Sequence, residues 1–349
     1  MTLFPTQEIG SLPKATPAEI VAWSERLGRP APDPAEGLVG TRSRFNLAFL
    51  RAAGLDSVYD GEAHRIEMAE HPYRSIVGAE FVGHVRSFDN KYFRKAAVRA
   101  APALRSPYHS EEFRFVRSVG AAPVDALKVP VTGPYTLSEW AYNDHFLARQ
   151  PDRYRREGRE RAQRELVVAL ARDVVRPTVA DLVRLGARRV QIDEPALGTH
   201  PRETALAVEG FEESVRGLDA EFAIHLCYSD YPRLLPAILE ARSCREWLWE
   251  FANRDVPGHD AYAVLRELRE YGDSRRVGVG VVDVHRDEVE SPERVADRLA
   301  RASRHLGDPG RLRANPDCGL RTRSWDVIWG KLRSVVAGAE LARRSMERA

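Results

Sequence analysis

Short apolar segments recur along the whole chain, and each is followed by sequence with a helix-like pattern of apolar residues. With one hairpin around residues 81–101 set aside as an insertion, eight segments are expected to be strands: 6–10, 56–61, 127–132, 188–193, 221–226, 246–250, 276–283 and 312–315. Alternating strands and helices favour an α/β fold with a parallel sheet. Eight strands, each followed by a helix pattern, in 349 residues predict a (β/α)8 TIM barrel forming a single domain over residues 1–349.

Side chains that can bind metals or move protons gather at the C-terminal ends of these segments. They are Ser11, Glu62, Asp193, Glu194, His225, Cys227, Glu250, Asp283, His285 and Cys318. In a (β/α)8 barrel the C-terminal strand ends meet at one face, where active sites are built. One acid at a strand end often only caps a helix, and one histidine is more often structural. The coincidence at so many strand ends is what argues for a functional site.

The strand at 221–226 leads into two metal-binding side chains, His225 and Cys227. Because strand side chains alternate with period two, both point to the same face. Alone, the pair is more simply a buried histidine beside a thiol. Glu250 and Cys318 end two other expected strands, however, and a set of one imidazole, two thiolates and one carboxylate suits zinc better than calcium or magnesium. The sequence therefore predicts a zinc site made by three strand ends.

Charge and hydropathy exclude several classes of partner. The 53 basic and 51 acidic residues leave a net charge of +2, which gives no field to attract nucleic acid or an anionic membrane. No window approaches about 18 consecutive apolar residues, and the first residues lack the features of a signal peptide. Three cysteines, two of them in the expected zinc site, exclude a disulfide framework and favour a reducing cytoplasm.

Taken in order, the segments around these residues resemble the C-terminal catalytic barrel of cobalamin-independent methionine synthase, in its short single-barrel form. The matching segments are IGS (9–11), DGEA (60–63), TGPYTL (132–137), QIDEPAL (191–197), HLCY (225–228), GVVDVH (280–285) and NPDCGL (315–320). They span nearly the whole chain. HLCY and NPDCGL are the specific ones, whereas IGS or GP alone would indicate nothing.

The resemblance implies a zinc-dependent methyltransferase that converts homocysteine to methionine. Its implied zinc ligands are His225, Cys227, Glu250 and Cys318. A free thiol has a pKa of about 8.5 and is mostly protonated at neutral pH, whereas a thiol bound to zinc is deprotonated. Zinc would therefore supply the attacking thiolate of homocysteine.

The resemblance also implies how the two substrates are held. The amino group of homocysteine would bind Glu62 and Asp193, and its carboxylate would bind the backbone around Ile9 and Ser11. Trp140 would lie against the pterin of a folate donor.

A proton donor is also implied, because a methyl group leaves an amine nitrogen readily only when that nitrogen is protonated. His285 would be this proton donor, with Asp283 as the group expected to orient it.

Departures from the family pattern fall on the side of the methyl donor. The segment 85–94 differs, Thr199 stands where the long enzymes carry glutamate, and Arg286 follows His285 in place of a serine-proline pair. The expected donor is a methyltetrahydrofolate. A methylcorrinoid such as methylcobalamin, or another small donor, is the alternative, with a corrinoid or accessory protein as a candidate partner.

A zinc hydrolase on the same barrel is a more distant alternative. No expected strand carries a His-x-His pair, and two thiolate ligands make zinc a poorer activator of water. A non-catalytic metal store would leave Glu62, Asp193 and His285 without a role.

Overall fold

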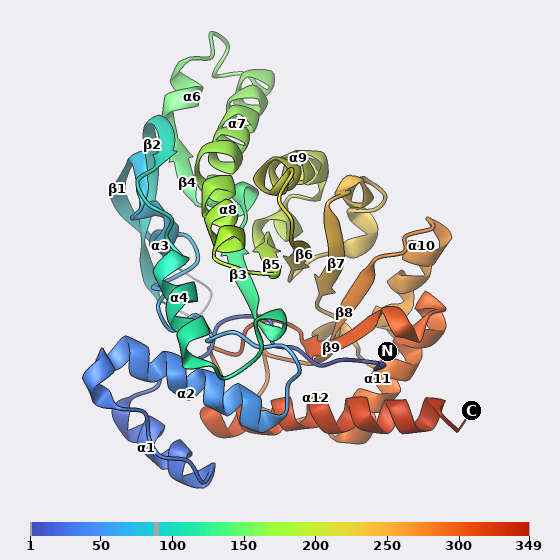
Figure 1. The fold of residues 1–349 in the computed structure, drawn as a ribbon. Helices are drawn as coiled ribbons and strands as arrows, with labels where there is room; N and C mark the ends of the chain where they lie inside the picture. The colour runs from blue at the N-terminus through green and yellow to red at the C-terminus, as the bar shows by residue number, and fades with distance from the viewer. Residues whose placement is uncertain (1, 87–90, 349) are drawn as a thin grey trace. The chain divides into compact units, whose positions relative to one another are not determined.

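The computed structural model describes residues 2–86 and 91–348 of the chain (Figure 1). The chain divides into two compact units. The first unit comprises Met1–His64, Arg114–Val129 and Arg245–Ala349, and the second comprises Arg65–Phe113 and Pro130–Cys244. The expectation of a single domain over residues 1–349 stays a prediction.

Three parallel strands form the centre of the first unit. They are β7 (Cys244–Trp249), β8 (Arg276–Val282) and β9 (Leu312–Pro316), and they pair in that order. After Arg276, every residue of β8 is buried. Such a nearly continuous apolar run is typical of a parallel strand that is covered on both faces.

The two expected strands nearest the N-terminus are reduced to isolated bridges in the first unit. Parallel bridges join Thr6 to Ala314, Gln7 to Ser57, and Val58 to Leu127. This is the neighbour order expected for the barrel, but the segments 6–10 and 56–61 are not regular strands, so that detail of the prediction was wrong. The Asp56 carboxylate accepts the backbone N–H of Thr6 at 2.7 Å and its hydroxyl at 2.9 Å, so this N–H bonds to a side chain and not to a neighbouring strand.

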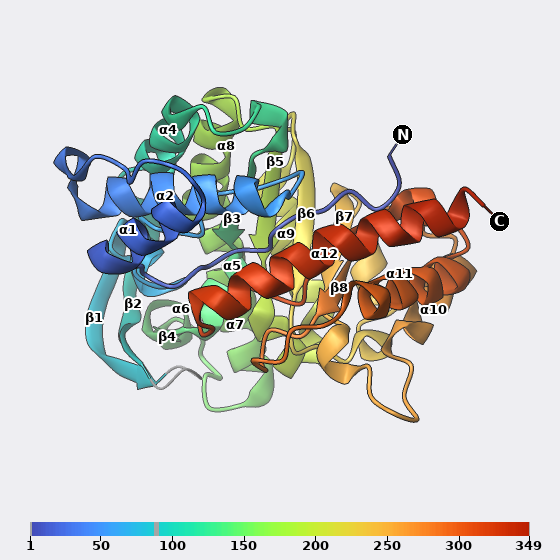
Figure 2. The same ribbon diagram turned by 90° about the horizontal axis from the view of Figure 1, so that it is seen from below.

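Helices cover these strands of the first unit. The helices of this unit are α1 (Pro17–Arg26), α2 (Gly37–Ala53), α10 (Leu265–Glu270), α11 (Pro292–Leu306) and α12 (Trp325–Met346), of which α11 and α12 contact β8 and β9. Thr16 and Glu19 form a capping box at the start of α1, which satisfies backbone N–H groups there. Figure 2 shows α12 lying along α11, with which it is in contact. The edge-on rings of Phe49 in α2 and Trp325 in α12 join these two helices, with centroids 5.1 Å apart.

In the second unit, β5 (Arg189–Asp193) pairs in parallel with β6 (Glu221–Leu226). These strands, β3 (Lys128–Thr132) and β7 to β9 belong to one six-stranded sheet. All six begin and end within two residues of the expected strands. The α/β class with a parallel sheet is therefore confirmed.

The expected hairpin is present in the second unit and is longer than predicted. Its strands β1 (Ile76–Arg86) and β2 (Tyr92–Leu104) are antiparallel. The short strand β4 (Ala141–Asn143), which the sequence did not predict, adds to β2 in parallel. Residues 87–90, which include the expected turn at Asp89 and Asn90, lie outside the described residues.

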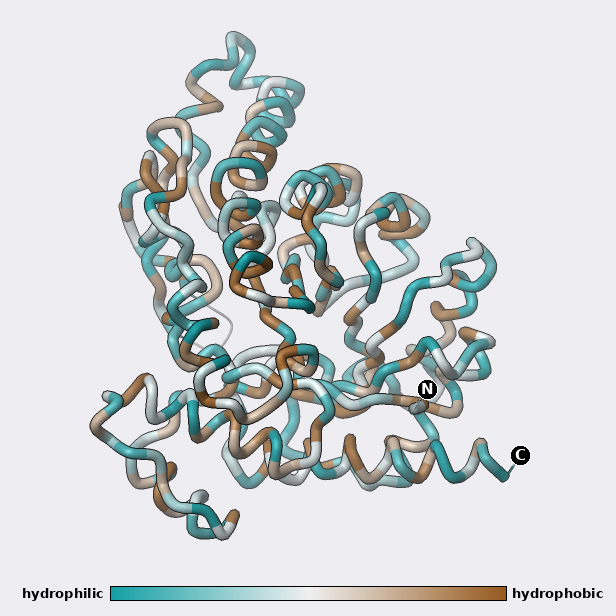
Figure 3. Tube along the Cα trace, in the orientation of Figure 1, coloured by the Kyte–Doolittle hydropathy of each residue, from teal (hydrophilic) through white to brown (hydrophobic). Residues whose placement is uncertain are grey.

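The remaining helices are α3 (Glu70–Tyr73), α4 (Ser110–Val119), α5 (Pro134–Glu139), α6 (Asp144–Ala148), α7 (Arg156–Leu170), α8 (Arg176–Arg184) and α9 (Thr204–Val215). A π-helical turn, Ala171–Val175, joins α7 to α8. Along α7 and α8, hydrophobic and hydrophilic residues alternate in Figure 3, as expected for helices with one buried face. Within the described residues, no helix has both the length and the apolar composition needed to cross a membrane.

Candidate metal and substrate site

Strand register places His225 and Asp193 side by side. These residues are partners in the parallel pairing of β5 and β6, so their side chains leave the sheet on the same face. Cys227 follows two residues after His225, just beyond the end of β6, and both are buried. Tyr228, the next residue, has a left-handed φ of 55°, which is rare for a bulky side chain. The backbone is thus turned sharply directly after the thiol.

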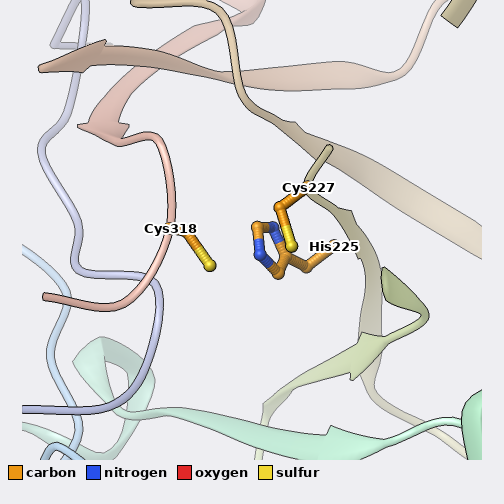
Figure 4. Close-up of side chains that lie close together, drawn as sticks. All are labelled: His225, Cys227 and Cys318. Atoms are coloured by element: carbon orange, nitrogen blue, oxygen red, sulfur yellow. The ribbon is translucent and has the colours of Figure 1, made fainter. Parts of the chain in front are cut away.

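The side chains of His225, Cys227 and Cys318 form one group. Their ligand atoms all lie within 4.8 Å of one another, and in Figure 4 the imidazole and the two sulfur atoms point toward one another. Zinc bonds of about 2.0 Å to nitrogen and 2.3 Å to sulfur place tetrahedral ligand atoms roughly 3.3–3.8 Å apart. Small side-chain rotations would therefore let these three atoms share one ion. One imidazole and two thiols form a candidate metal site with soft ligands that fit zinc.

Glu250, the fourth expected ligand, lies outside this group of three and faces His285. Its carboxylate is fully buried. One oxygen accepts a hydrogen bond from Asn253 Nδ2 at 2.9 Å, and the other, Oε2, lies 3.8 Å from Nε2 of His285. Its role as a metal ligand stays a prediction.

The charge of Glu250 also affects the expected proton donor. The neighbouring Glu250 carboxylate is the largest cause that raises the pKa of His285 above its ordinary value, and the charges of Asp283 and Asp317 add to it. Asp283 was expected to orient the imidazole. Its carboxylate instead accepts the backbone N–H of His285 at 2.8 Å and lies 3.6 Å from the guanidinium of Arg286. Asp283 therefore fixes the backbone of His285, whereas the carboxylate beside the imidazole belongs to Glu250.

Asp317, next to Cys318, is a site residue that the sequence did not reveal. Its buried carboxylate accepts the backbone N–H groups of Phe251, Ala252 and Asn253, each at 2.8 Å. Burial and the charge of Glu250 raise the pKa of Asp317 to about 8, against the opposite effect of the three N–H donors. The side chain thus ties the loop after β7 to the loop that carries Cys318.

The position of the Asp317 carboxylate requires a glycine at residue 280. A Cβ atom on Gly280 would lie 1.9 Å from Oδ1 of Asp317. The glycine of the GVVDVH segment is therefore required by the aspartate of the NPDCGL segment. The presence of both the GVVDVH and the NPDCGL motif in the sequence was the signal that could have indicated the contact between Gly280 and Asp317.

Glu62 and Ser11, two of the residues expected to bind homocysteine, both lie beside the segment that begins at Ile9 or within it, in the first unit. Glu62 has a left-handed φ of 59°, and its carboxylate is 3.4 Å from the position of a Cβ on Gly10. Ser11 Oγ lies 2.7 Å from the position of a Cβ on Gly319, directly after Cys318. The segment that begins at the buried Ile9 therefore runs between Glu62 and the Cys318 loop. Backbone strain of this kind is common at ligand sites.

In the second unit, the two acids that end β5 have different partners. Asp193 accepts a hydrogen bond from Gln191 Nε2 at 2.7 Å. The carboxylate of Glu194 accepts the N–H groups of Tyr135 and Thr136 at 3.1 and 2.7 Å, so it caps the start of α5. Burial raises the pKa of Glu194 to about 8. Glu194 therefore caps α5, which precedes it in the chain, and makes no side-chain cap for the helical turn that follows it, where the sequence offered a capping role.

Trp140, which is expected to contact the methyl donor, lies at the end of the helix that the Glu194 carboxylate caps. It is the half-buried residue at the C-terminal end of α5, the helix that Glu194 holds at its start. A Cβ on Gly133 would lie 2.0 Å from Glu194 Oε1, so only glycine fits before Pro134. The GP motif, which is ordinarily just a turn, here makes room for the capping carboxylate.

A second group of potential ligands lies in the second unit, formed by His71, His109 and Glu112. The Glu112 carboxylate is paired with the buried guanidinium of Arg65 at 2.6 Å and 3.1 Å. Burial lowers the pKa of His109 to about 4, so that imidazole is neutral. A guanidinium already neutralises the carboxylate that a cation would need, so this cluster is better explained as a buried ion pair.

Comparison with known proteins places this geometry in a family. A family model described as "Cobalamin-independent synthase, Catalytic domain" matches residues 4–341. The chain belongs to this family. The prediction of a methionine-synthase-type methyltransferase is thereby confirmed, and the zinc hydrolase alternative has no support.

Relatives of similar length extend the match over the whole chain. The methionine synthase of Thermoplasma acidophilum is 36% identical over 355 residues, covering 96% of this chain and 97% of that protein. The methionine synthase of Thermococcus kodakarensis is 34% identical and covers 100% of this chain and 96% of that protein.

Solved structures confirm the predicted barrel fold. A B12-independent methionine synthase from Shewanella sp. W3-18-1, solved in complex with selenomethionine, superposes with a TM-score of 0.79 at 24% identity over the full length of both chains. A putative vitamin-B12-independent methionine synthase from Listeria monocytogenes gives a TM-score of 0.66 at 16% identity, covering 97% of this chain.

Proposed function

We propose that this chain methylates the thiol of homocysteine to form methionine at a zinc site held by His225, Cys227 and Cys318. The observation that carries the proposal is the approach of one imidazole and two thiols to within 4.8 Å in a chain of this family. Zinc, when bound, supplies a Lewis acid that keeps a coordinated thiol deprotonated at neutral pH. Glu250, buried and close in sequence to the end of β7, is proposed as a further ligand.

The homocysteine amino group is proposed to bind the carboxylates of Glu62 and Asp193. Asp193 is the register partner of His225, which supports a place beside the metal ligands. The backbone from Ile9 to Ser11 is proposed to hold the substrate carboxylate. The approach of Ser11 to Gly319, next to Cys318, supports this role.

His285 is proposed to protonate the leaving nitrogen of the donor. Because Glu250 raises its pKa, a larger fraction of the imidazole carries a proton at neutral pH than in an isolated histidine. Asp283 contributes by fixing the backbone at His285. Trp140 is proposed to lie against the ring system of the donor.

The proposed donor is a methyltetrahydrofolate. Thr199 stands where long enzymes of the family carry a glutamate, and its hydroxyl bonds to Ala196 O at 2.9 Å, within its own loop. This difference makes a methylcorrinoid the alternative donor, either free or on a partner protein. The three cysteines are present as thiols and not as disulfides, which supports a reducing compartment such as the cytoplasm as the proposed location.

A donor screen tests the proposal. Purified, zinc-loaded protein is incubated with isotope-labelled homocysteine and methyltetrahydrofolate, methylcobalamin or a methylated corrinoid protein. Labelled methionine is expected with one donor and is expected to disappear after exhaustive chelation. Equal turnover without metal, or no methionine with any donor, would contradict the proposal.

A further inference from the structure

Arg298 in α11 is a buried cation that no step above uses. Its guanidinium donates to Val281 O at 2.9 Å, to Ala252 O at 3.2 Å and to the Asp255 carboxylate at 3.0 Å, and it lies 3.5 Å from Glu290. The side chain is 1% exposed. A buried charge is costly unless it is paired and hydrogen-bonded, and the rigid fork of arginine can meet several acceptors at once.

These contacts connect two segments that carry site residues of the first unit. Ala252 and Asp255 belong to the loop after β7, which begins at Glu250. Val281 is near the end of β8, the strand that leads to His285. The guanidinium therefore bonds to the backbone of both segments at once.

Glu290 extends this connection toward His285. Its carboxylate accepts the backbone N–H of Asp283 at 2.6 Å and pairs at 2.9 Å with Lys331, which is fully buried in α12. Asp283 in turn accepts the N–H of His285. A series of contacts of 3.5, 2.6 and 2.8 Å thus runs from Arg298 through the Glu290 carboxylate and Asp283 to the backbone of His285.

Asp317 also holds the β7 loop, through the three N–H groups of residues 251–253. The loop of Glu250 is consequently fixed by a carboxylate next to Cys318 and by a guanidinium beside the end of β8. Side chains that orient metal ligands and catalytic groups in this way commonly change metal affinity or activity when removed.

We propose that Arg298 is a positioning residue for methyl transfer, holding the loop of Glu250 against the segment of His285. In this arrangement Glu250 Oε2 stays 3.8 Å from His285 Nε2. The inference rests on the proposed function, in which Glu250 and His285 act together at the zinc site.

Arg301 supplies a matched control. It lies on the same helix and pairs with the same Asp255 carboxylate at 2.7 Å, and it also pairs with Asp260 and Asp297. Its described bonds go to carboxylates, whereas those of Arg298 also go to the two backbone carbonyls. Loss of Arg301 therefore removes ion pairs but not the link between the segments.

The test compares Arg298→Met, Arg298→Lys and Arg301→Met with the wild-type protein. Thermal unfolding, zinc affinity by chelator competition, and kcat and KM for homocysteine are measured on each. Arg298→Met is expected to lower kcat by about 10–100-fold and to weaken zinc binding by about tenfold. Arg298→Lys, which keeps the charge but not the fork, is expected to be intermediate, and Arg301→Met to stay within about twofold.

Wild-type kcat and zinc affinity in folded Arg298→Met would overturn the inference, as would equal losses in Arg298→Met and Arg301→Met. If Arg298→Met does not fold, a folded Arg298→Lys with wild-type values is decisive against it. A wild-type protein that methylates no homocysteine with any donor contradicts the proposed function instead. The zinc affinities of the variants then still decide whether Arg298 positions the site.

Discussion

At the scale of single residues, two of the cysteines are candidate metal ligands and the third is a buried packing residue. Cys227 and Cys318 lie in the group of candidate ligands, whereas Cys244 carries the same thiol but lies buried at the start of β7, outside that group. The three thiols differ in their neighbours and not in their intrinsic chemistry. A substitution series can therefore distinguish a metal ligand from a buried apolar group.

Cys227→Ser and Cys318→Ser are expected to lower the zinc content of purified protein from about one ion per chain to well under half, because each removes a soft ligand. Elemental analysis and methyl-transfer rates give the measurement. Cys244→Ala is the control, expected to retain zinc and most activity at a modest cost in stability. A Cys318→Ser protein with full zinc would contradict the assigned ligand set.

At the scale of elements, buried carboxylates fix the segments that carry site residues. Glu194 caps α5 and thereby places Trp140, and Asp317 fixes the loop after β7. Both contacts depend on a glycine that leaves room for the carboxylate. The short helix α5 has no side-chain cap of its own, so its start depends on a residue from another element.

Gly133→Ala is expected to destabilise the protein by about 1–3 kcal/mol and to reduce donor use, because its Cβ would displace Glu194 from the start of α5. Urea unfolding and KM for the donor are the measurements. Gly83→Ala in β1 is the control, since nothing lies within 4 Å of its added Cβ and its expected change is under about 0.5 kcal/mol. A stable Gly133→Ala variant with normal KM would show that the cap does not place Trp140.

At the scale of the whole molecule, the buried pair of His109 and Glu112 makes stability depend on pH. Burial lowers the pKa of His109 to about 4, and the charge of Arg65 adds to this. The unfolded chain, with a histidine pKa of about 6.5, binds more protons than the folded chain between these values. The contribution to stability is therefore full above about pH 6.5 and is lost as the pH falls toward 4.

Urea unfolding between pH 7.5 and 4.5 is expected to show this loss, which amounts to roughly 2–3 kcal/mol at most from His109. His109→Gln is expected to have a shallower slope over the same range, by close to one proton. Identical slopes in the two proteins would contradict a neutral, buried His109.

The sequence alone determined the α/β barrel class, the positions of β3 and β5 to β9, and the identity of the candidate ligands His225, Cys227 and Cys318. These depend on local information, because apolar runs define buried strands and the end of a parallel strand defines one face of the fold. Only the tertiary structure decided that segments 6–10 and 56–61 form isolated bridges and that Glu250 faces His285. It alone assigned the cap of α5 to Glu194 and placed Asp317 and Arg298 against the β7 loop. Each of these contacts joins residues that are far apart in the chain, so a local pattern of apolar residues cannot predict them.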